Sequence, residues 1–348
     1  MDPLELTTLL ALLRRPGIGS QTAIRLSLTR GSHHELSPRL ARLLPRSLSR
    51  PLNSRERNTL AEITSGSLLS LADQDEIKIF LKENAVRGIT AVHFFDERYP
   101  PLLRLTPQPP AVLYYLGNLT PLHLPTMTIA GTREPSATGI QRARGSISLL
   151  AKATSSFDRE ALKHPEPFGV ISGLALGIDG IAHRAALDHG LYTAAVVGGG
   201  LDQRYPTQHR KLWDNILLAG GVIVSEQPFY FRQTTASLVQ RDRIQSALSM
   251  VTYVVESSAR GGSLHTARAA LRQGRSLWLP RSLRETLSEF KQVSTVLWLS
   301  HEAEFTEALH TARTQRLRLL ERAHELSREL FSNSNEDSEV QTPLLTSY

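Results

Sequence analysis

A short apolar run that breaks into a glycine-containing turn and then resumes with helical spacing constrains this chain more than any other feature. It reads VISGLALGIDGIAH and occupies residues 170–183. A buried strand would deliver the chain to the turn, where Gly173 and Gly177 leave backbone N–H groups bare. An anionic oxygen can approach such groups closely, so the pattern predicts a phosphate-binding turn.

Similar turns follow other apolar runs of the chain. In an open parallel sheet the strands end at one edge, where the next helices begin, so we expect these turns to line up there. One edge would then carry several anion-binding loops. The turns are Gly131-Thr132-Arg133 with Ser136 and Gly139, Val197-Gly198-Gly199-Gly200, and Glu256-Ser257 with Gly261-Gly262-Ser263.

From residue 126 onward, apolar runs alternate with amphipathic segments. This alternation is typical of β-α-β units and predicts an α/β fold with a doubly wound, mostly parallel sheet and helices on both faces. The runs expected to form strands are residues 127–130, 169–172, 193–197, 222–225, 251–256 and 276–279.

The remaining residues are expected to form smaller parts. Two short helices flanking Pro16-Gly17-Ile18-Gly19 predict a helix-hairpin-helix, whose backbone either contacts a DNA phosphate or only mediates packing. Prolines between residues 96 and 118 exclude regular helix and predict an extended connector. The expected parts are a helical domain at 1–88, the connector at 89–125, the main domain at 126–300, helices at 301–331 and a disordered tail at 332–348.

The composition favours an anionic partner. The formal net charge is +7 and the sequence pI is near 9.8, which points to nucleic acid ahead of acidic lipid. The chain has no cysteine, so disulfides and thiolate metal sites are excluded. No signal peptide or membrane-spanning run is recognisable, which predicts a cytoplasmic protein without membrane contact.

Four arginines are candidates for binding phosphate. Arg133 and Arg204 follow turns at the predicted edge, where their guanidinium groups would flank backbone donors. The alternative for each is a solvated loop arginine. Arg241 and Arg243 straddle Asp242 and point to different helix faces, so one can reach a ligand while the other forms an ion pair.

Other polar side chains carry weaker signals. Asp179 and His183 stand one helical turn apart; a helix cap with its hydrogen-bond partner is favoured over a metal site or proton relay. Hydroxyls of Ser172, Ser225 and Ser263 fit phosphate donors, because none lies in a Gly-x-Ser-x-Gly frame. The chain lacks a P-loop and a Gly-x-Gly-x-x-Gly turn with its acidic partner, so no nucleotide cofactor or metal is expected.

Taken together, these motifs resemble the DNA-processing protein A (DprA/Smf) family over roughly residues 5–280. The resemblance implies an extended Rossmann-like domain that binds single-stranded DNA without hydrolysing it, forms a homodimer and helps load the RecA recombinase in natural transformation. The DNA-binding positions that it implies are Gly131, Thr132, Arg133, Ser136, Gly139, Ser172, Gly173, Leu174, Ala175, Gly177, Arg204, Arg241, Arg243, Gly262 and Ser263, with Asp179 and His183 as structural support.

Two features depart from that family. Asp242 replaces the asparagine of its Arg-Asn-Arg motif, and no winged-helix domain is recognisable after residue 280. Two other functions remain open: a small-nucleotide sensor or phosphoribohydrolase-like enzyme, for which Glu256 is the candidate carboxylate, and a structural scaffold. A binding protein without catalytic activity is the leading hypothesis.

Overall fold

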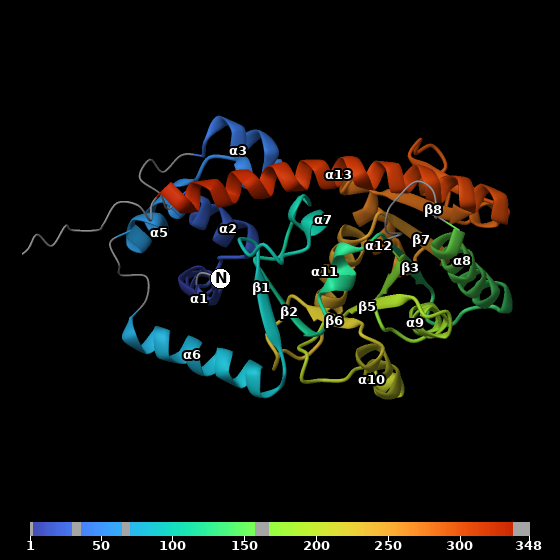
Figure 1. The fold of residues 1–348 in the computed structure, drawn as a ribbon, viewed down its shortest axis with the longest axis horizontal. Helices are drawn as coiled ribbons and strands as arrows, with labels where there is room; N and C mark the ends of the chain where they lie inside the picture. Colours follow the sequence, from blue (N-terminus) through green and yellow to red (C-terminus); the bar gives the residue numbers. More distant parts are fainter. Residues whose placement is uncertain (1–2, 30–35, 65–69, 157–166, 337–348) are drawn as a thin grey trace, which may run out of the picture. The chain divides into compact units, whose positions relative to one another are not determined.

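The computed structural model describes residues 3–29, 36–64, 70–156 and 167–336, which form two compact units. The first unit comprises Met1–Ile77, His93–Ala111 and Arg318–Tyr348, and the second comprises Lys78–Val92 and Val112–Leu317. The first is mainly helical and the second contains the sheet (Figure 1). Residues 337–348 of the predicted tail lie outside the described part of the chain.

The sheet has nine strands in the order β1-β2-β6-β5-β4-β3-β7-β8-β9. All pairings from β6 across to β9 are parallel, whereas β2 pairs with β6 in the antiparallel sense. The predicted mostly parallel, doubly wound sheet is therefore confirmed. The strands are β1 (Thr90–His93), β2 (Val112–Gly117), β3 (Thr126–Gly131), β4 (Gly169–Ser172), β5 (Tyr192–Val196), β6 (Val222–Ser225), β7 (Val251–Glu256), β8 (Ser276–Pro280) and β9 (Val296–Leu299).

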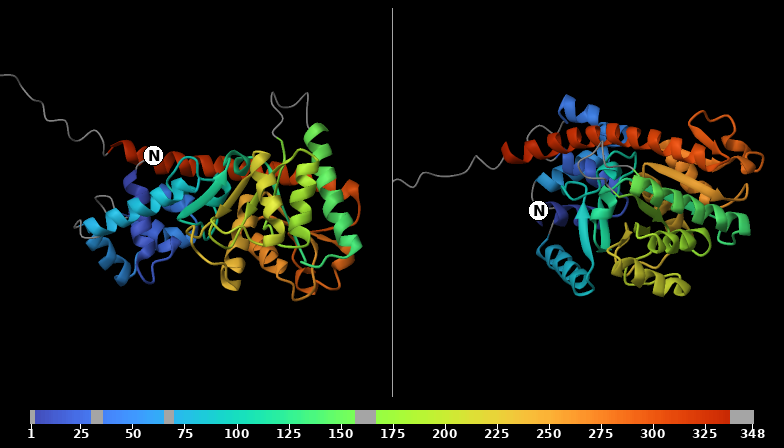
Figure 2. Two further views of the ribbon diagram at one scale, coloured as in Figure 1. Left: turned by 90° about the horizontal axis from the view of Figure 1, so that it is seen from below. Right: turned by 45° about the vertical axis from the view of Figure 1, so that its right-hand side comes forward.

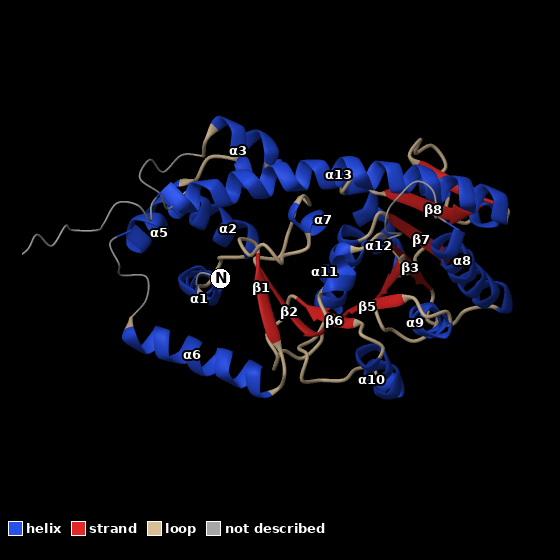
Figure 3. Cartoon of the chain, in the orientation of Figure 1, coloured by secondary structure: helices blue, strands red, loops and turns tan. Residues whose placement is uncertain are grey.

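Helices cover both faces of this sheet, as Figures 1 and 3 show; Figure 2 gives two further views. One face carries α8 (Ala137–Ser156), α9 (Ile178–Asp188) and the first turns of α13 (Glu302–Glu336), whose apolar residues share one core cluster. Helix α12 (Ser263–Arg272) packs in a separate cluster with residues of β7 and β8, beside α11 (Thr235–Leu248). Helix α10 (Arg210–Leu218) lies next to α9, and the short turns are η1 (Thr120–His123), η2 (Thr207–His209), η3 (Arg281–Leu283) and η4 (Ser288–Phe290).

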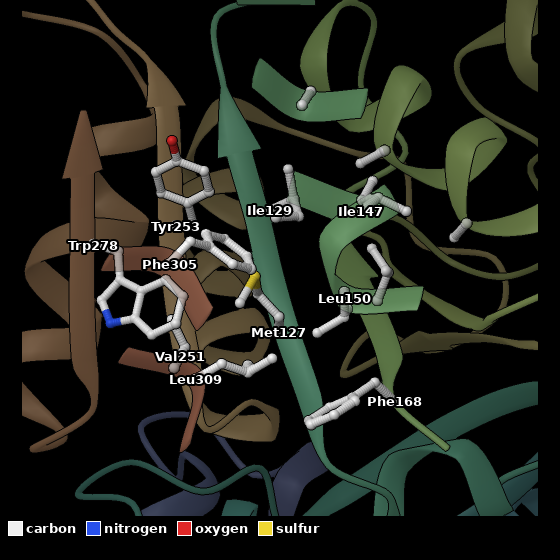
Figure 4. Close-up of a cluster of buried hydrophobic side chains, with 14 of the residues drawn as sticks. Met127, Ile129, Ile147, Leu150, Phe168, Val251, Tyr253, Trp278, Phe305 and Leu309 are labelled. Carbon is white, nitrogen blue, oxygen red and sulfur yellow. The ribbon is translucent and has the colours of Figure 1, made fainter. Parts of the chain in front are cut away.

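The larger core cluster fills the space between the sheet and helices α8, α9 and α13. Apolar residues of β3 and β7 face Ile147 and Leu150 of α8, because central parallel strands are buried on both sides. Three aromatic rings pack edge to face where α13 begins (Figure 4). The ring centroid of Phe305 lies 5.1 Å from that of Trp278 and 6.1 Å from that of Tyr253. This packing holds the strand ends and the loops that follow them in place.

The helical unit confirms the two predicted N-terminal helices. Its hairpin lies between α1 and α2, and the guanidinium of Arg55 donates 2.7 Å to the carbonyl of Pro16. The prediction that prolines exclude helix from the connector is wrong, because Pro100 and Pro101 stand at the start of α7, where no N–H is needed. The helices are α1 (Pro3–Arg14), α2 (Ser20–Leu28), α3 (Pro38–Leu43), α4 (Arg46–Ser49), α5 (Ser54–Thr64), α6 (Leu71–Val86) and α7 (Pro101–Arg104).

Candidate nucleic-acid interface

The glycine turns that follow β3, β4 and β7 meet at the carboxyl edge of the sheet, as the sequence predicts. Backbone hydrogen bonds join them: Ile178 donates 3.1 Å to the carbonyl of Thr132, and Thr132 donates 3.0 Å to that of Glu256. Gly177 has φ +78°, and a Cβ there would lie 2.4 Å from the Thr132 oxygen. Only glycine fits this position, so the turn after β4 packs directly on the turn after β3.

The turn after β4 faces a carboxylate of the chain itself. The backbone N–H of Ala175 lies 3.4 Å from Oδ2 of Asp179, and Leu174 adopts the left-handed φ of 59°. Ser172 is fully buried and its hydroxyl donates 2.7 Å to the carbonyl of Ile129. Any phosphate at this turn therefore competes with Asp179.

A second carboxylate occupies the turn after β3. Oε2 of Glu256 accepts a 3.0 Å hydrogen bond from the backbone of Ser136, just before α8. The Ser136 hydroxyl accepts from Gly139 at 3.1 Å and so caps the helix. Because a helix N-terminus favours negative charge, Glu256 stabilises the start of α8.

Arg241 is a buried structural residue. Its side chain is 8% exposed; Nη1 donates 2.6 Å to the carbonyl of Val196, and Nε pairs with Asp242 at 3.0 Å. Asp179 lies 3.8 Å from Nη2. A Cβ on Gly173 would stand 1.6 Å from Nη1, so the missing side chain there makes room for the guanidinium.

Burial shifts the protonation of the two carboxylates around Arg241. It raises the pKa of Asp179, and it raises the pKa of Asp242 to about 7 even though Arg241 acts in the opposite direction. Asp242 also interacts electrostatically with Asp179 and Arg133. The aspartate that departs from the family motif is thus the counter-charge of a buried arginine.

The expected hydrogen bond between His183 and Asp179 does not form. Nδ1 of His183 lies 2.7 Å from the hydroxyl of Thr193, which itself donates to the carbonyl of Val170. That arrangement assigns the ring proton to Nδ1. Burial lowers the pKa of His183 to about 3, so the ring stays neutral.

An open pocket of about 360 Å³ lies beyond β5, at the same edge. The loops after β5 and β6 form it, and the backbone of Gly200 joins them by donating 2.8 Å to the carbonyl of Phe231. Tyr205 is 56% exposed, and Arg232 is exposed and forms no hydrogen bond or ion pair with another described residue. We call this the rim pocket; its lining residues are Val197, Gly199, Gln203, Tyr205, Arg232 and Gln233.

The other predicted arginines differ in their availability. Arg133 is exposed and has no hydrogen bond or ion pair with the rest of the described chain. Arg204 pairs with Asp214 at 2.7 Å, and Arg243 donates 2.6 Å to Glu226. The structure therefore leaves Arg133 as the predicted arginine with an unengaged guanidinium.

The turn after β7 contributes less to this group. The hydroxyl of Ser263 donates 2.9 Å to that of Ser257, and the α-carbon of Gly262 faces open space. The hydroxyl of Ser225 donates 2.7 Å to the carbonyl of Gly199. These hydroxyl protons satisfy the protein itself and are not free for a phosphate.

Sequence reasoning missed most of the lining of the rim pocket. The predicted turn at residues 197–200 includes Val197 and Gly199, whereas Gln203, Tyr205, Arg232 and Gln233 are not among the predicted positions. The signal for Arg232 lies in the run Phe229-Tyr230-Phe231-Arg232, because aromatic and basic residues side by side are typical of single-strand binding surfaces.

The described residues contain neither a cluster of metal ligands nor a membrane-spanning helix. No group of three or more His, Asp or Glu side chains in that part of the chain is arranged to hold a metal ion. None of the helices formed by those residues has the length and apolar character needed to cross a bilayer.

Known proteins share this fold and sequence. Protein Smf of Escherichia coli K12 is 37% identical over 183 residues, which are 53% of this chain and 46% of that protein. The chain thus spans about half the length of this relative. DNA processing protein A of Streptococcus pneumoniae has a solved structure with a TM-score of 0.59 at 23% identity, covering 82% of this chain and 97% of that one, and it shows the same fold.

A second solved structure is more similar in sequence. It concerns the single-stranded DNA binding mode of DNA processing protein A from Helicobacter pylori, with a TM-score of 0.53 and 26% identity over 64% of this chain and 96% of that chain. Residues 90–309 match the family described as DNA recombination-mediator protein A. Since this match covers more than half of the sequence, the chain belongs to the DNA recombination-mediator protein A family.

Proposed function

We propose that this protein binds single-stranded DNA along the carboxyl edge of its sheet and does not cut it. The observation that carries the proposal is the rim pocket, where exposed Tyr205 lies beside unpaired Arg232. An aromatic face stacks on any base, and a guanidinium pairs with the phosphates, which suits a strand bound without sequence preference. The Helicobacter pylori relative, whose structure concerns single-stranded DNA binding, supports the same ligand.

The residues divide the work between contact and support. Arg133 and Arg232 would pair with phosphates, Tyr205 would stack on a base, and the amides of Gln203 and Gln233 would bond base edges. The other turn positions implied by the family would position these contacts and offer backbone N–H groups where Glu256 and Asp179 do not already bind them. Arg241 would hold the turns together from its buried position.

The wider role rests on family membership. We propose that the protein acts in the cytoplasm as a homodimer and assists RecA loading during natural transformation or recombination. The N-terminal hairpin would add a phosphate contact. The helical domain that contains it would thereby support DNA binding by the main domain. Catalysis by Glu256 is not favoured, because its carboxylate is bound to the backbone of Ser136 at the start of α8.

Fluorescence anisotropy with a labelled oligothymidylate tests the DNA proposal. Arg133→Ala and Arg232→Ala should each weaken binding about three- to thirtyfold at low salt and reduce its salt dependence, because each removes one phosphate contact. Arg272→Ala is the matched control: this arginine is also exposed, but it lies in the last turn of α12, at the opposite edge of the sheet. Equal binding by all four proteins would rule out the rim as the DNA site.

A further inference from the structure

A second pocket, separate from the rim pocket, lies on the α8 face of the sheet. Its volume is about 690 Å³, which falls within the roughly 300–1,000 Å³ typical of small-molecule sites. It is bounded by α8, by Tyr253 of β7, by the carboxyl ends of β8 and β9, and by the start of α13. It therefore opens at the edge of the sheet where ligands of such folds bind.

Tyr253 presents its hydroxyl to this pocket. The residue is 6% exposed and packs its ring on Phe305, yet its hydroxyl makes no hydrogen bond with any described residue. Figure 4 shows the hydroxyl at the far end of the core cluster, pointing away from Met127 and Leu309. Burial raises the pKa of Tyr253 to about 12, so the hydroxyl remains a neutral donor that lacks an acceptor.

Two arginines, Arg142 and Arg281, line this pocket together with the acidic Glu302. Arg142 of α8 acts electrostatically on Tyr253, and its Nη2 donates 2.6 Å to the hydroxyl of Ser282, but it has no acidic partner among the described residues. Arg281 lines the same pocket, is 57% exposed and lies 3.5 Å from Glu304. Arg142 is therefore the cation that an incoming anion can neutralise.

Part of the lining of this pocket is apolar. Leu149 of α8, Leu299 of β9 and the ring of Phe305 line it. A ligand that fits this pocket must combine a flat apolar body with an anionic group. A nucleotide has both, since its base stacks on apolar side chains and its phosphate pairs with guanidinium groups.

The geometry points to a second binding site, in which this pocket takes a nucleoside phosphate with its base against Leu149 and Leu299 and its phosphate between Arg142 and the Tyr253 hydroxyl. The nucleotide is either free in solution or one unit of a bound single strand; the chemistry is the same in both. Only the second source rests on the proposed DNA-binding function.

Isothermal titration with dAMP, dTMP and inorganic phosphate tests whether the ligand is a free nucleotide. Arg142→Ala should weaken mononucleotide binding about tenfold or more, and Tyr253→Phe about three- to tenfold, because they remove a charged and a neutral hydrogen bond. Arg144→Ala is the matched control, since this arginine is exposed on the same helix and does not line the pocket. Thermal melts of all variants check that they fold.

Labelled oligonucleotides of increasing length test whether the ligand is one nucleotide of a bound single-stranded DNA. In that case mononucleotides fail to bind, and Arg142→Ala and Tyr253→Phe weaken binding only of oligonucleotides long enough to reach the pocket, whereas Arg133→Ala weakens all lengths. The inference is overturned if neither ligand responds to Arg142→Ala, if inorganic phosphate binds as tightly as dAMP, or if the substitution changes only self-association measured by sedimentation.

Discussion

Two groups of loops at one edge of this sheet carry similar residues but differ in what those residues bind. The closed turns are residues 131–139, apart from the side chain of Arg133, and residues 172–179. They direct N–H groups of Ser136 and Ala175 at Glu256 and Asp179, and Arg241 is buried among their neighbours. The open rim, formed by Arg133 and the rim pocket, has an exposed tyrosine and two arginines without partners in the described chain. The turns that carry the sequence motifs have hydrogen-bonding groups paired within the protein. The exposed tyrosine and arginines of the open rim have no such partner in the described chain.

The difference teaches that a turn rich in glycine and arginine need not be the contact surface itself. A buried donor or charge is costly unless it is paired, so the protein supplies its own carboxylates wherever turns and guanidinium groups are buried. Exposed side chains carry no such cost and stay available for a ligand. The closed turns would then set the geometry, and the open rim would provide the affinity.

The largest expected effect separates the two groups by stability. Arg241→Met should lower the free energy of unfolding by about 3–5 kcal/mol, because it leaves Asp179 and Asp242 buried without their counter-charge. Arg204→Met is the control at an exposed ion pair: the side chains of Arg204 and its partner Asp214 are 51% and 43% exposed, so the loss should be about 1 kcal/mol or less. Urea unfolding at pH 8 measures both, and equal losses would contradict a buried structural role for Arg241.

The second prediction addresses the open rim. Tyr205→Ala should weaken binding of a labelled oligothymidylate by about 1–3 kcal/mol, the usual contribution of one base stacked on an aromatic ring. Its melting temperature should not change, since the side chain is 56% exposed. Tyr205→Phe should keep the affinity because the ring face remains.

Tyr192→Ala serves as the control for that substitution. Tyr192 is 38% exposed but stands at the first residue of β5, at the opposite edge of the sheet. If Tyr192→Ala and Tyr205→Ala weaken binding to the same degree, the open rim has no special role in holding the strand.

The sequence was sufficient to predict the central strands and the edge at which their turns gather. Apolar runs bounded by glycine turns predicted β3 to β8, since a strand buried on both faces leaves that pattern. Strands β2 and β9 were not predicted. Proline neighbours masked β2, and β9 is a four-residue edge strand without a glycine turn beside it.

The carboxylates and the guanidinium group that lie against the turns could not be predicted from the sequence, for a physical reason. Asp179 follows its turn closely in sequence, but Glu256 reaches Ser136 across 120 residues, and nothing local marks that pairing. Arg241 likewise lies 68 positions from Gly173, and only the assembled fold places its guanidinium over the bare α-carbon. Local patterns specify which groups are bare, whereas tertiary packing decides what covers them.

The smallest expected effect tests whether the closed turns tolerate their second carboxylate. Burial raises the folded-state pKa of Asp242 to about 7, so its protonated form favours the folded protein, and stability is lost as pH rises from about 4 through 7. Asp242→Asn removes this loss while Asp179 still pairs with Arg241. The variant should therefore be more stable than the wild type by at least about 1 kcal/mol at pH 8, with the difference vanishing near pH 4. A difference that instead grows toward low pH would show that the Asp242 carboxylate stabilises the fold, and the closed turns would then depend on both of their acidic residues.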